Sequence, residues 1–151
     1  MDYSLLTLFS GSFLASTLLP GGSEALLLWH LHQANHAPPI LWLTATLGNT
    51  LGGLSSWLIG WWLAKRFPQK GLKDQRQRQA LERIGRYGSP ALLLSWLPVV
   101  GDPLCLAAGW AGVRFSLAML FIGIGKGIRY AVVIWLSEAA LQSLINLNLM
   151  R

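Results

Sequence analysis

The stretch PILWLTATLGNTLGGLSSWLIGWWLA, residues 39–64, contains 26 consecutive residues without a charged side chain. As a helix it would be about 39 Å long, which exceeds the roughly 30 Å thickness of the bilayer hydrocarbon. Its first residue is a proline, which suits the first turn of a helix, and Trp57, Trp61 and Trp62 lie near its end, where indole rings favour the membrane interface. The stretch therefore predicts one tilted transmembrane helix.

The composition of the whole chain agrees with a lipid environment. Of the 151 residues, 53% are hydrophobic and 12% are charged, and the mean hydropathy is +0.46. A soluble domain carries roughly 25% charged residues. This composition excludes a solvated disordered chain, and the single cysteine, Cys105, excludes a disulfide scaffold. We expect one all-α integral membrane domain over residues 1–151, with Cys105 as a buried thiol.

The positive charge is concentrated in residues 65–88. This segment holds eight of the twelve basic residues and two acids, so it carries a net charge of +6, the same as the whole chain. Lysine and arginine close to membrane spans mark cytoplasmic loops, and this position argues against a nucleic-acid-binding surface. We predict a cytoplasmic loop whose residues 73–84 form a short helix on anionic lipid headgroups. A plain polar linker is the alternative.

A second crossing is predicted over residues 115–137, with two cations at its centre. Lys126 and Arg129 are three residues apart and therefore share one face of a helix. A cation in the middle of the bilayer costs about 2.5 to 3.5 kcal/mol. We therefore expect both side chains to face protein, water or acidic partners. Residues 138–151 are predicted to form a tail after this helix.

The two remaining apolar segments, residues 1–36 and 89–113, are each interrupted by a turn. Each predicts a helix, a turn with one acid, Glu24 or Asp102, and a second short helix. The 11 residues before the second turn would span only about 16 Å, so a re-entrant hairpin is predicted. For the first segment, a full crossing by residues 3–19 is the alternative. The predicted hairpin tips are Pro20, Gly21 and Gly22 in the first segment, and Pro98, Gly101 and Pro103 in the second.

The two halves of the chain share one pattern. In each half a proline precedes the acid by four residues, and a glycine of the following long helix, Gly48 or Gly125, comes 24 or 23 residues after the acid. A hairpin does not cross the membrane and the following helix crosses once, so the second half would enter from the opposite face. This pattern predicts an inverted repeat, an architecture in which transporters place the substrate site at the midplane. The glycine-rich helix faces would also permit a homodimer.

Four segments carry a resemblance to a known family: LLPGGSEALLL at 18–28, LTATLGNTLGGL at 43–54, RYGSPALLLSWLPVVGDPLCLAAGW at 86–110 and GKGIRY at 125–130. They resemble the YqaA-like branch of the DedA family, whose shared unit is the VTT domain, over roughly residues 5–138. The resemblance implies paired re-entrant hairpins in a bacterial inner membrane. It also implies movement of undecaprenyl phosphate or phospholipid across the bilayer, with proton coupling through membrane-embedded acids.

One departure from the family pattern concerns the basic residues. Other branches carry arginines in the second hairpin, at positions that here are Ser95 and Gly101. In this chain the basic residues lie in the last helix instead, at Lys126 and Arg129. If the arginines of the relatives bind a lipid phosphate, Lys126 and Arg129 are expected to do so here.

The charges within the apolar segments form a neutral set. Glu24 and Asp102 are negative, and Lys126 and Arg129 are positive. Burial drives each group toward its uncharged form, while an opposite neighbour restores the charge. We predict a site in which Lys126 and Arg129 hold a lipid phosphate, Asn49 donates a hydrogen bond, and protonation of Glu24 or Asp102 changes the affinity. The alternative is two ion pairs with a purely structural role.

The sequence therefore predicts a lipid transporter of the inner membrane, and neither an enzyme nor a cofactor protein. A proton-coupled exporter of hydrophobic cations would suit the tryptophans, but two buried cations would repel its substrate. A lipid-processing enzyme would need a nucleophile or metal motif, and we find none. The three histidines have no acid or cysteine at ligand spacing, so no metal site is predicted.

With loop 65–88 cytoplasmic, the first hairpin would open outward, the second inward near Arg114, and the C-terminus would lie outside.

Overall fold

The computed structural model describes residues 3–16, 22–66, 88–97 and 100–149. Within these ranges every regular element is helical and none is a strand, which confirms the all-helical prediction. The elements, in chain order, are α1 (Tyr3–Ala15), α2 (Gly22–Gln33), α3 (Pro38–Arg66), the 3-10 helix η1 (Ser89–Trp96), α5 (Gly101–Trp110) and α6 (Phe115–Leu149).

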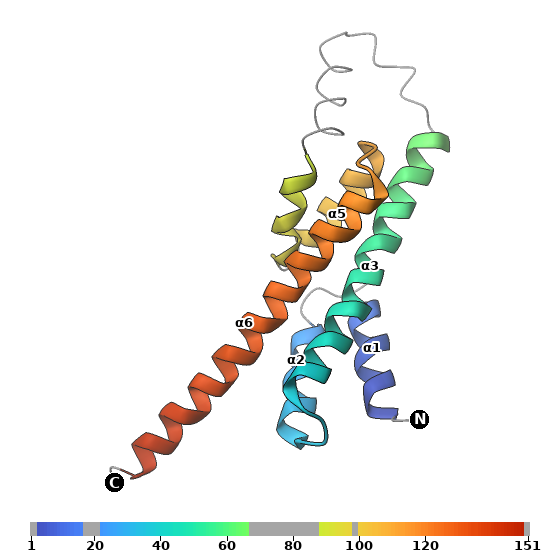
Figure 1. Cartoon of the computed structure of the whole chain (residues 1–151). Coiled ribbons are helices and arrows are strands. Elements are labelled where there is room, and N and C mark those ends of the chain that lie inside the picture. Colours follow the sequence, from blue (N-terminus) through green and yellow to red (C-terminus); the bar gives the residue numbers. More distant parts are fainter. Residues whose placement is uncertain (1–2, 17–21, 67–87, 98–99, 150–151) are drawn as a thin grey trace.

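The long helices α3 and α6 pack against each other and form the centre of the fold (Figure 1). The pair α1 and α2 lies at one end of this centre, and the pair η1 and α5 lies at the other. Helix α3 contacts α1, α2 and α5, and α6 contacts η1 and, less extensively, α2 and α5. Each short pair is therefore held between the two long helices.

Each end of the molecule has its own apolar core. Leu8, Leu27 and Leu41 are fully buried around α1, α2 and α3. Leu92 and Cys105 are fully buried where η1 and α5 meet the long helices. The predicted burial of the Cys105 thiol is confirmed, because its exposed fraction is 0%. Two cores leave the polar groups of the fold concentrated between them.

The exterior is strongly apolar. Along α3, the large side chains of Leu43, Leu47 and Leu51 recur every four residues and are about half exposed. Helix α6 similarly exposes Ile124 and Ile128. Monomeric soluble proteins rarely expose continuous apolar surfaces of this kind. The surface is consistent with an all-helical membrane protein.

One helix in the described ranges meets both the length and the hydropathy expected of a membrane span, namely residues Phe115–Asn148 of α6. Helix α3 has 29 residues and is also long enough. Polar and small residues in its middle lower its hydropathy, and several of them, including Gly48, Asn49 and Gly52, face inward. The crossing of residues 39–64 stays a prediction.

The predicted crossing at 115–137 and most of the predicted tail at 138–151 form one continuous helix, because α6 runs without a break to Leu149. Residues 138–149 contain neither glycine nor proline, and most of them are good helix formers. The helix therefore has 35 residues instead of the 23 predicted.

Three of the predicted tip residues, Gly22, Gly101 and Pro103, are helical. Gly22 begins α2, and Gly101, Asp102 and Pro103 form the first turn of α5, so these residues are helical. Proline is accepted there because the first turn needs no N–H donor, and an acid is favoured by the helix dipole. The remaining predicted tip residues, Pro20, Gly21 and Pro98, and residues 67–87 of the basic loop lie outside the described residues.

Glycines allow the helices to approach within the chain. A Cβ atom at Gly109 of α5 would collide with the backbone oxygen of Trp57, and one at Gly60 of α3 would collide with that of Leu106. A Cβ atom at Gly48 would likewise collide with α1, and one at Gly125 would collide with η1. These four glycines are used for contacts inside one chain. The homodimer stays a prediction.

Candidate functional site

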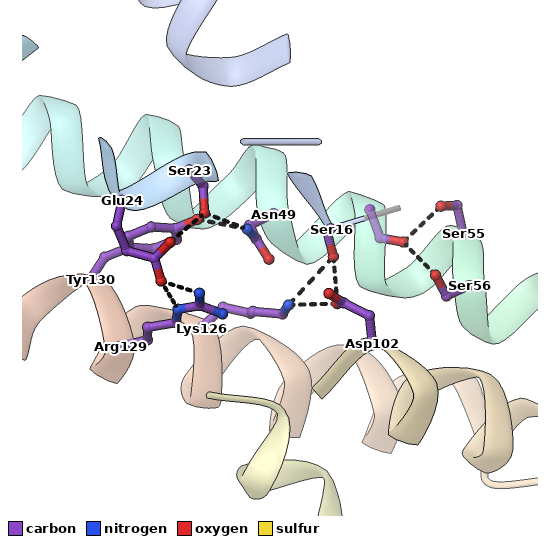
Figure 2. Close-up of polar contacts among 11 residues, drawn as sticks. Ser16, Ser23, Glu24, Asn49, Ser55, Ser56, Asp102, Lys126, Arg129 and Tyr130 are labelled. Carbon is purple, nitrogen blue, oxygen red and sulfur yellow. Dashed lines mark hydrogen bonds and ion pairs between the residues drawn. The ribbon is translucent and has the colours of Figure 1, made fainter. Parts of the chain in front are cut away.

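The centre of α6 carries two buried cations. The Lys126 side chain is fully buried, and Arg129 is 7% exposed. Both point from one face of α6 into the space between the two short helical pairs, as Figure 2 shows. In this interior a cation needs an acidic partner, and each of the two has one.

Lys126 pairs with Asp102, which comes from the first turn of α5. Its Nζ lies 2.8 Å from Asp102 Oδ1. Ser16, just beyond the end of α1, donates a hydrogen bond of 2.7 Å to the same carboxylate oxygen, and Lys126 Nζ donates a longer one of 3.4 Å to Ser16 Oγ. Ser16 and Asp102 are 86 positions apart in the chain, so this contact joins the two halves.

Arg129 pairs with Glu24, which comes from the first turn of α2. The guanidinium donates from both Nε and Nη2 to Glu24 Oε1. Ser23 Oγ donates to the other oxygen, Oε2, at 3.4 Å. The acid of each helical pair is therefore bound to a different cation of α6.

Asn49 of α3 connects the second ion pair to a buried phenol. Its Nδ2 donates to Tyr130 Oη at 2.6 Å and to Ser23 Oγ at 3.4 Å. Asn49 is 2% exposed, and its Oδ1 has no hydrogen-bond partner among the described residues. The structure thus places Asn49 beside the Glu24–Arg129 pair, through Ser23, and gives it no direct bond to Lys126.

The two acids are more accessible than the two cations. The side chains of Glu24 and Asp102 are 22% and 23% exposed, whereas those of Arg129 and Lys126 are 8% and 0% exposed. The carboxylates are therefore the members of the two pairs that an approaching group can contact more easily. The four charges sum to zero, and removing one partner of a buried pair typically costs about 3 to 5 kcal/mol.

Sequence reasoning missed Ser16, Ser23 and Tyr130. The two serines are small polar residues that flank the first predicted tip, and Tyr130 follows Arg129 directly. Polar residues next to predicted buried charges would have been a usable signal, since buried charges need hydrogen bonds as well as counter-charges.

The two positions that are arginine in other branches are closely packed here. Ser95 is fully buried in η1, and a Cβ atom at Gly125 would lie 2.7 Å from its Oγ. A Cβ atom at Gly101 would collide with the backbone oxygen of Ser95. An arginine at either position would require the backbone or α6 to move. Beside Ser95 the space is occupied by α6, and beside Gly101 it is occupied by the backbone of η1.

The three histidines do not form a cluster with other metal ligands in the part of the chain that the structure describes. His30 Nδ1 lies 2.8 Å from the carbonyl oxygen of Leu26, one turn earlier in α2. His36 Nε2 lies 2.8 Å from Ser4 Oγ and joins the start of α1 to the turn before α3. These contacts account for two of the histidines as structural residues.

Comparison with known proteins identifies one family. The family model of the VTT domain matches residues 19–139. The Inner membrane protein YqaA of Escherichia coli K12 is 46% identical over 131 residues, which cover 86% of this chain and 88% of that protein, and the Shigella flexneri protein of the same name matches equally. An uncharacterized protein of Haemophilus influenzae is 42% identical over 143 residues, with 89% and 87% covered. No solved structure matches significantly.

Proposed function

The chain belongs to the VTT-domain (DedA) family, and on this premise we propose that it is a bacterial inner-membrane transporter that moves a phosphate-bearing lipid across the bilayer. The observation that carries the proposal is the pair of buried cations on one face of α6, each held by an acid from a different helical pair. A lipid phosphate is the anion in a membrane that could take the place of either acid.

The proposed cycle begins with proton binding to Glu24 or Asp102. A neutral carboxyl no longer balances its cation, and a buried cation without a counter-charge is costly. A phosphate then binds to Lys126 as a point charge and to Arg129 through its planar guanidinium. Loss of the proton restores the ion pair and expels the phosphate. Over the whole cycle the phosphate takes the place of one carboxylate as the counter-charge on α6 and is then replaced by it.

Two re-entrant hairpins would give the central site access to both sides of the membrane. Helix α1 has 13 residues and η1 has 8, so they extend about 20 Å and about 16 Å, less than the hydrocarbon thickness. We propose that α1 with α2, and η1 with α5, enter from opposite faces as an inverted repeat. The bond between Ser16 and Asp102 supports this, because it joins the inner ends of the two pairs.

Cysteine labelling tests the proposed topology. In a Cys105→Ala background, single cysteines at Asn35 and Asn148 are expected to react with an impermeant maleimide added outside intact cells. A cysteine at Gln75, in the basic segment, is expected to react only after permeabilisation, because that segment resists translocation. Labelling of position 75 from outside would reverse the orientation. Labelling of 35 and 148 from opposite sides would exclude the inverted repeat.

Translocation in liposomes tests the function. We expect reconstituted protein to move a fluorescent anionic phospholipid faster than protein-free liposomes do, with a rate that rises as the pH falls, because a protonated acid releases its cation. Glu24→Gln mimics the protonated acid permanently and is expected to weaken this pH dependence. The matched control is Glu138→Gln, which neutralises an exposed acid outside the site. An unaltered pH profile in Glu24→Gln would exclude Glu24 as the proton site.

If the ion pairs serve only to hold the helical pairs together, reconstituted protein would not accelerate lipid movement at any pH. The same assay therefore separates the proposed function from a structural role. Head-group variants of the fluorescent lipid, with and without a net negative charge, would then define the substrate class.

A further inference from the structure

A second candidate site lies at the end of the molecule where α3 finishes and α6 begins. A groove of about 430 Å³ runs there between Trp57, Leu58 and Trp61 of α3 and the α5–α6 connection, which contributes Val113 and Arg114 and leads into Phe115. Its volume falls in the range of small-ligand pockets. It shares no residue with the buried ion pairs.

The walls of the groove are aromatic and preorganised. The rings of Trp57 and Trp61 stack with their centroids 6.5 Å apart, and the Phe115 ring meets Trp57 edge-on at 5.4 Å. Trp57 is buried, whereas Leu58 and Phe115 are about half exposed. A surface of this kind, in an apolar exterior, suits an acyl chain.

Among the described residues, the charges around the groove are all positive. Arg114 lines it and is exposed, and it immediately precedes α6, whose N-terminal end carries the positive pole of the helix dipole. Lys65 Nζ lies 3.7 Å from the centroid of the Trp61 ring. In the described part of the chain the exposed lysine and arginine side chains are Lys65, Arg66 and Arg114, and α3 ends at the same end of the fold as the α5–α6 connection (Figure 1).

A second groove at the opposite end of the α3–α6 pair provides a contrast. It measures about 330 Å³ and is also lined by two tryptophans, Trp42 and Trp135. Its one charged lining residue is Glu138. The two grooves are alike in size and aromatic content but opposite in charge. The positive charge of the first groove is therefore not a general property of the apolar surface.

We propose that the basic groove binds one anionic phospholipid of the surrounding membrane. The phosphate lies against Arg114 and the start of α6, and one acyl chain follows Trp57, Leu58 and Phe115. Lys65, held over Trp61, adds a second positive charge at the headgroup. This site concerns a bound lipid and does not rest on the proposed translocation through the centre of α6.

Native mass spectrometry of the purified full-length protein tests the proposal, with phosphatidylglycerol and phosphatidylcholine of equal chain length as probes. We expect tighter binding of phosphatidylglycerol. Arg114→Gln is expected to weaken it about tenfold, because a charge-assisted hydrogen bond is lost. Leu58→Gln, which keeps every charge, is expected to weaken both lipids. Arg66→Gln is the matched control. It removes an exposed positive charge at the same end of the molecule but outside the groove, and it is expected to change binding less than twofold.

Three results would overturn the proposal. Equal losses of phosphatidylglycerol binding in Arg114→Gln and Arg66→Gln would show that the lipid is attracted by the general positive charge of that end of the molecule. Equal binding of the two lipids by the wild type would show an apolar surface without headgroup recognition. Displacement of phosphatidylglycerol by millimolar inorganic phosphate would show a site for free anions. Arg114 and Leu58 are exposed, and thermal unfolding without added lipid checks that both variants fold like the wild type.

Discussion

Replacing Lys126 with Met and Asp102 with Asn in the same chain is expected to leave a folded protein that no longer translocates lipid. The two side chains form a buried pair at 2.8 Å, and their simultaneous neutralisation leaves no uncompensated charge. Replacing a whole buried ion pair with neutral groups of similar size is often neutral or stabilising. A phosphate, however, loses Lys126, one of the two positive charges that the proposed site needs. We expect the translocation rate to fall at least a hundredfold, to the protein-free level.

The liposome assay measures the rate, and thermal unfolding in detergent measures the stability. Lys126→Met alone is expected to destabilise the protein by about 3 kcal/mol, because Asp102 would keep its hydrogen bond from Ser16 but lose its counter-charge. Arg66→Met is the control, since it removes an exposed cation of α3 outside both proposed sites. A double variant that translocates at the wild-type rate would contradict a role of Lys126 in phosphate binding.

Gly109→Ala is expected to have the largest effect on folding. The added Cβ would collide with the backbone oxygen of Trp57, and neither helix backbone can move aside without separating α5 from α3. Overpacking in a core typically costs about 1 to 3 kcal/mol, and a collision with backbone lies at or above the upper end of that range. Because α5 carries Asp102, the separation would also break the first ion pair.

Gly123→Ala is the matched control for this prediction. Its Cβ would meet only a methyl group of Thr50 at 3.8 Å, an ordinary contact distance. Alanine in place of glycine inside a helix favours the helix by up to about 1 kcal/mol, so this variant is expected to be at least as stable as the wild type. The midpoints of unfolding in a denaturing detergent titration measure both effects. Equal midpoints for the two variants would contradict the close approach of α3 and α5.

The sequence alone predicted the features that follow from the cost of placing charged groups in an apolar environment. A run without charges over residues 39–64 leaves few alternatives to a long helix, and α3 covers it. Two cations inside an apolar stretch need acids, and Glu24 and Asp102 were the candidates within the apolar segments. The structure brings these four residues together, whereas their role in transport stays a prediction.

Other features depend on geometry that the sequence does not contain. The assignment of Asp102 to Lys126 and of Glu24 to Arg129 follows from where α2 and α5 begin along α6, which a pattern of residues does not specify. Tyr130 was overlooked although it follows Arg129 directly, because packing alone would explain an aromatic residue in an apolar helix. Gly22, Gly101 and Pro103 were predicted as tip residues but are helical, since a turn and the first turn of a helix favour the same residues.

The length of α6 depends on more than the length of a membrane crossing. Residues 115–137 were predicted as a crossing because 23 residues are enough to span the hydrocarbon, whereas the helix continues to Leu149. Helix formation depends on the absence of helix-breaking residues, and residues 138–149 contain neither glycine nor proline.

The most direct test of a phosphate site on α6 is a density map of the protein in an anionic lipid bilayer at low pH, where Glu24 and Asp102 can be protonated. We predict a headgroup phosphate between the two helical pairs, within hydrogen-bonding distance of Lys126 Nζ and the Arg129 guanidinium. Both ion pairs intact at low pH, with every lipid phosphate confined to the membrane surfaces, would contradict it.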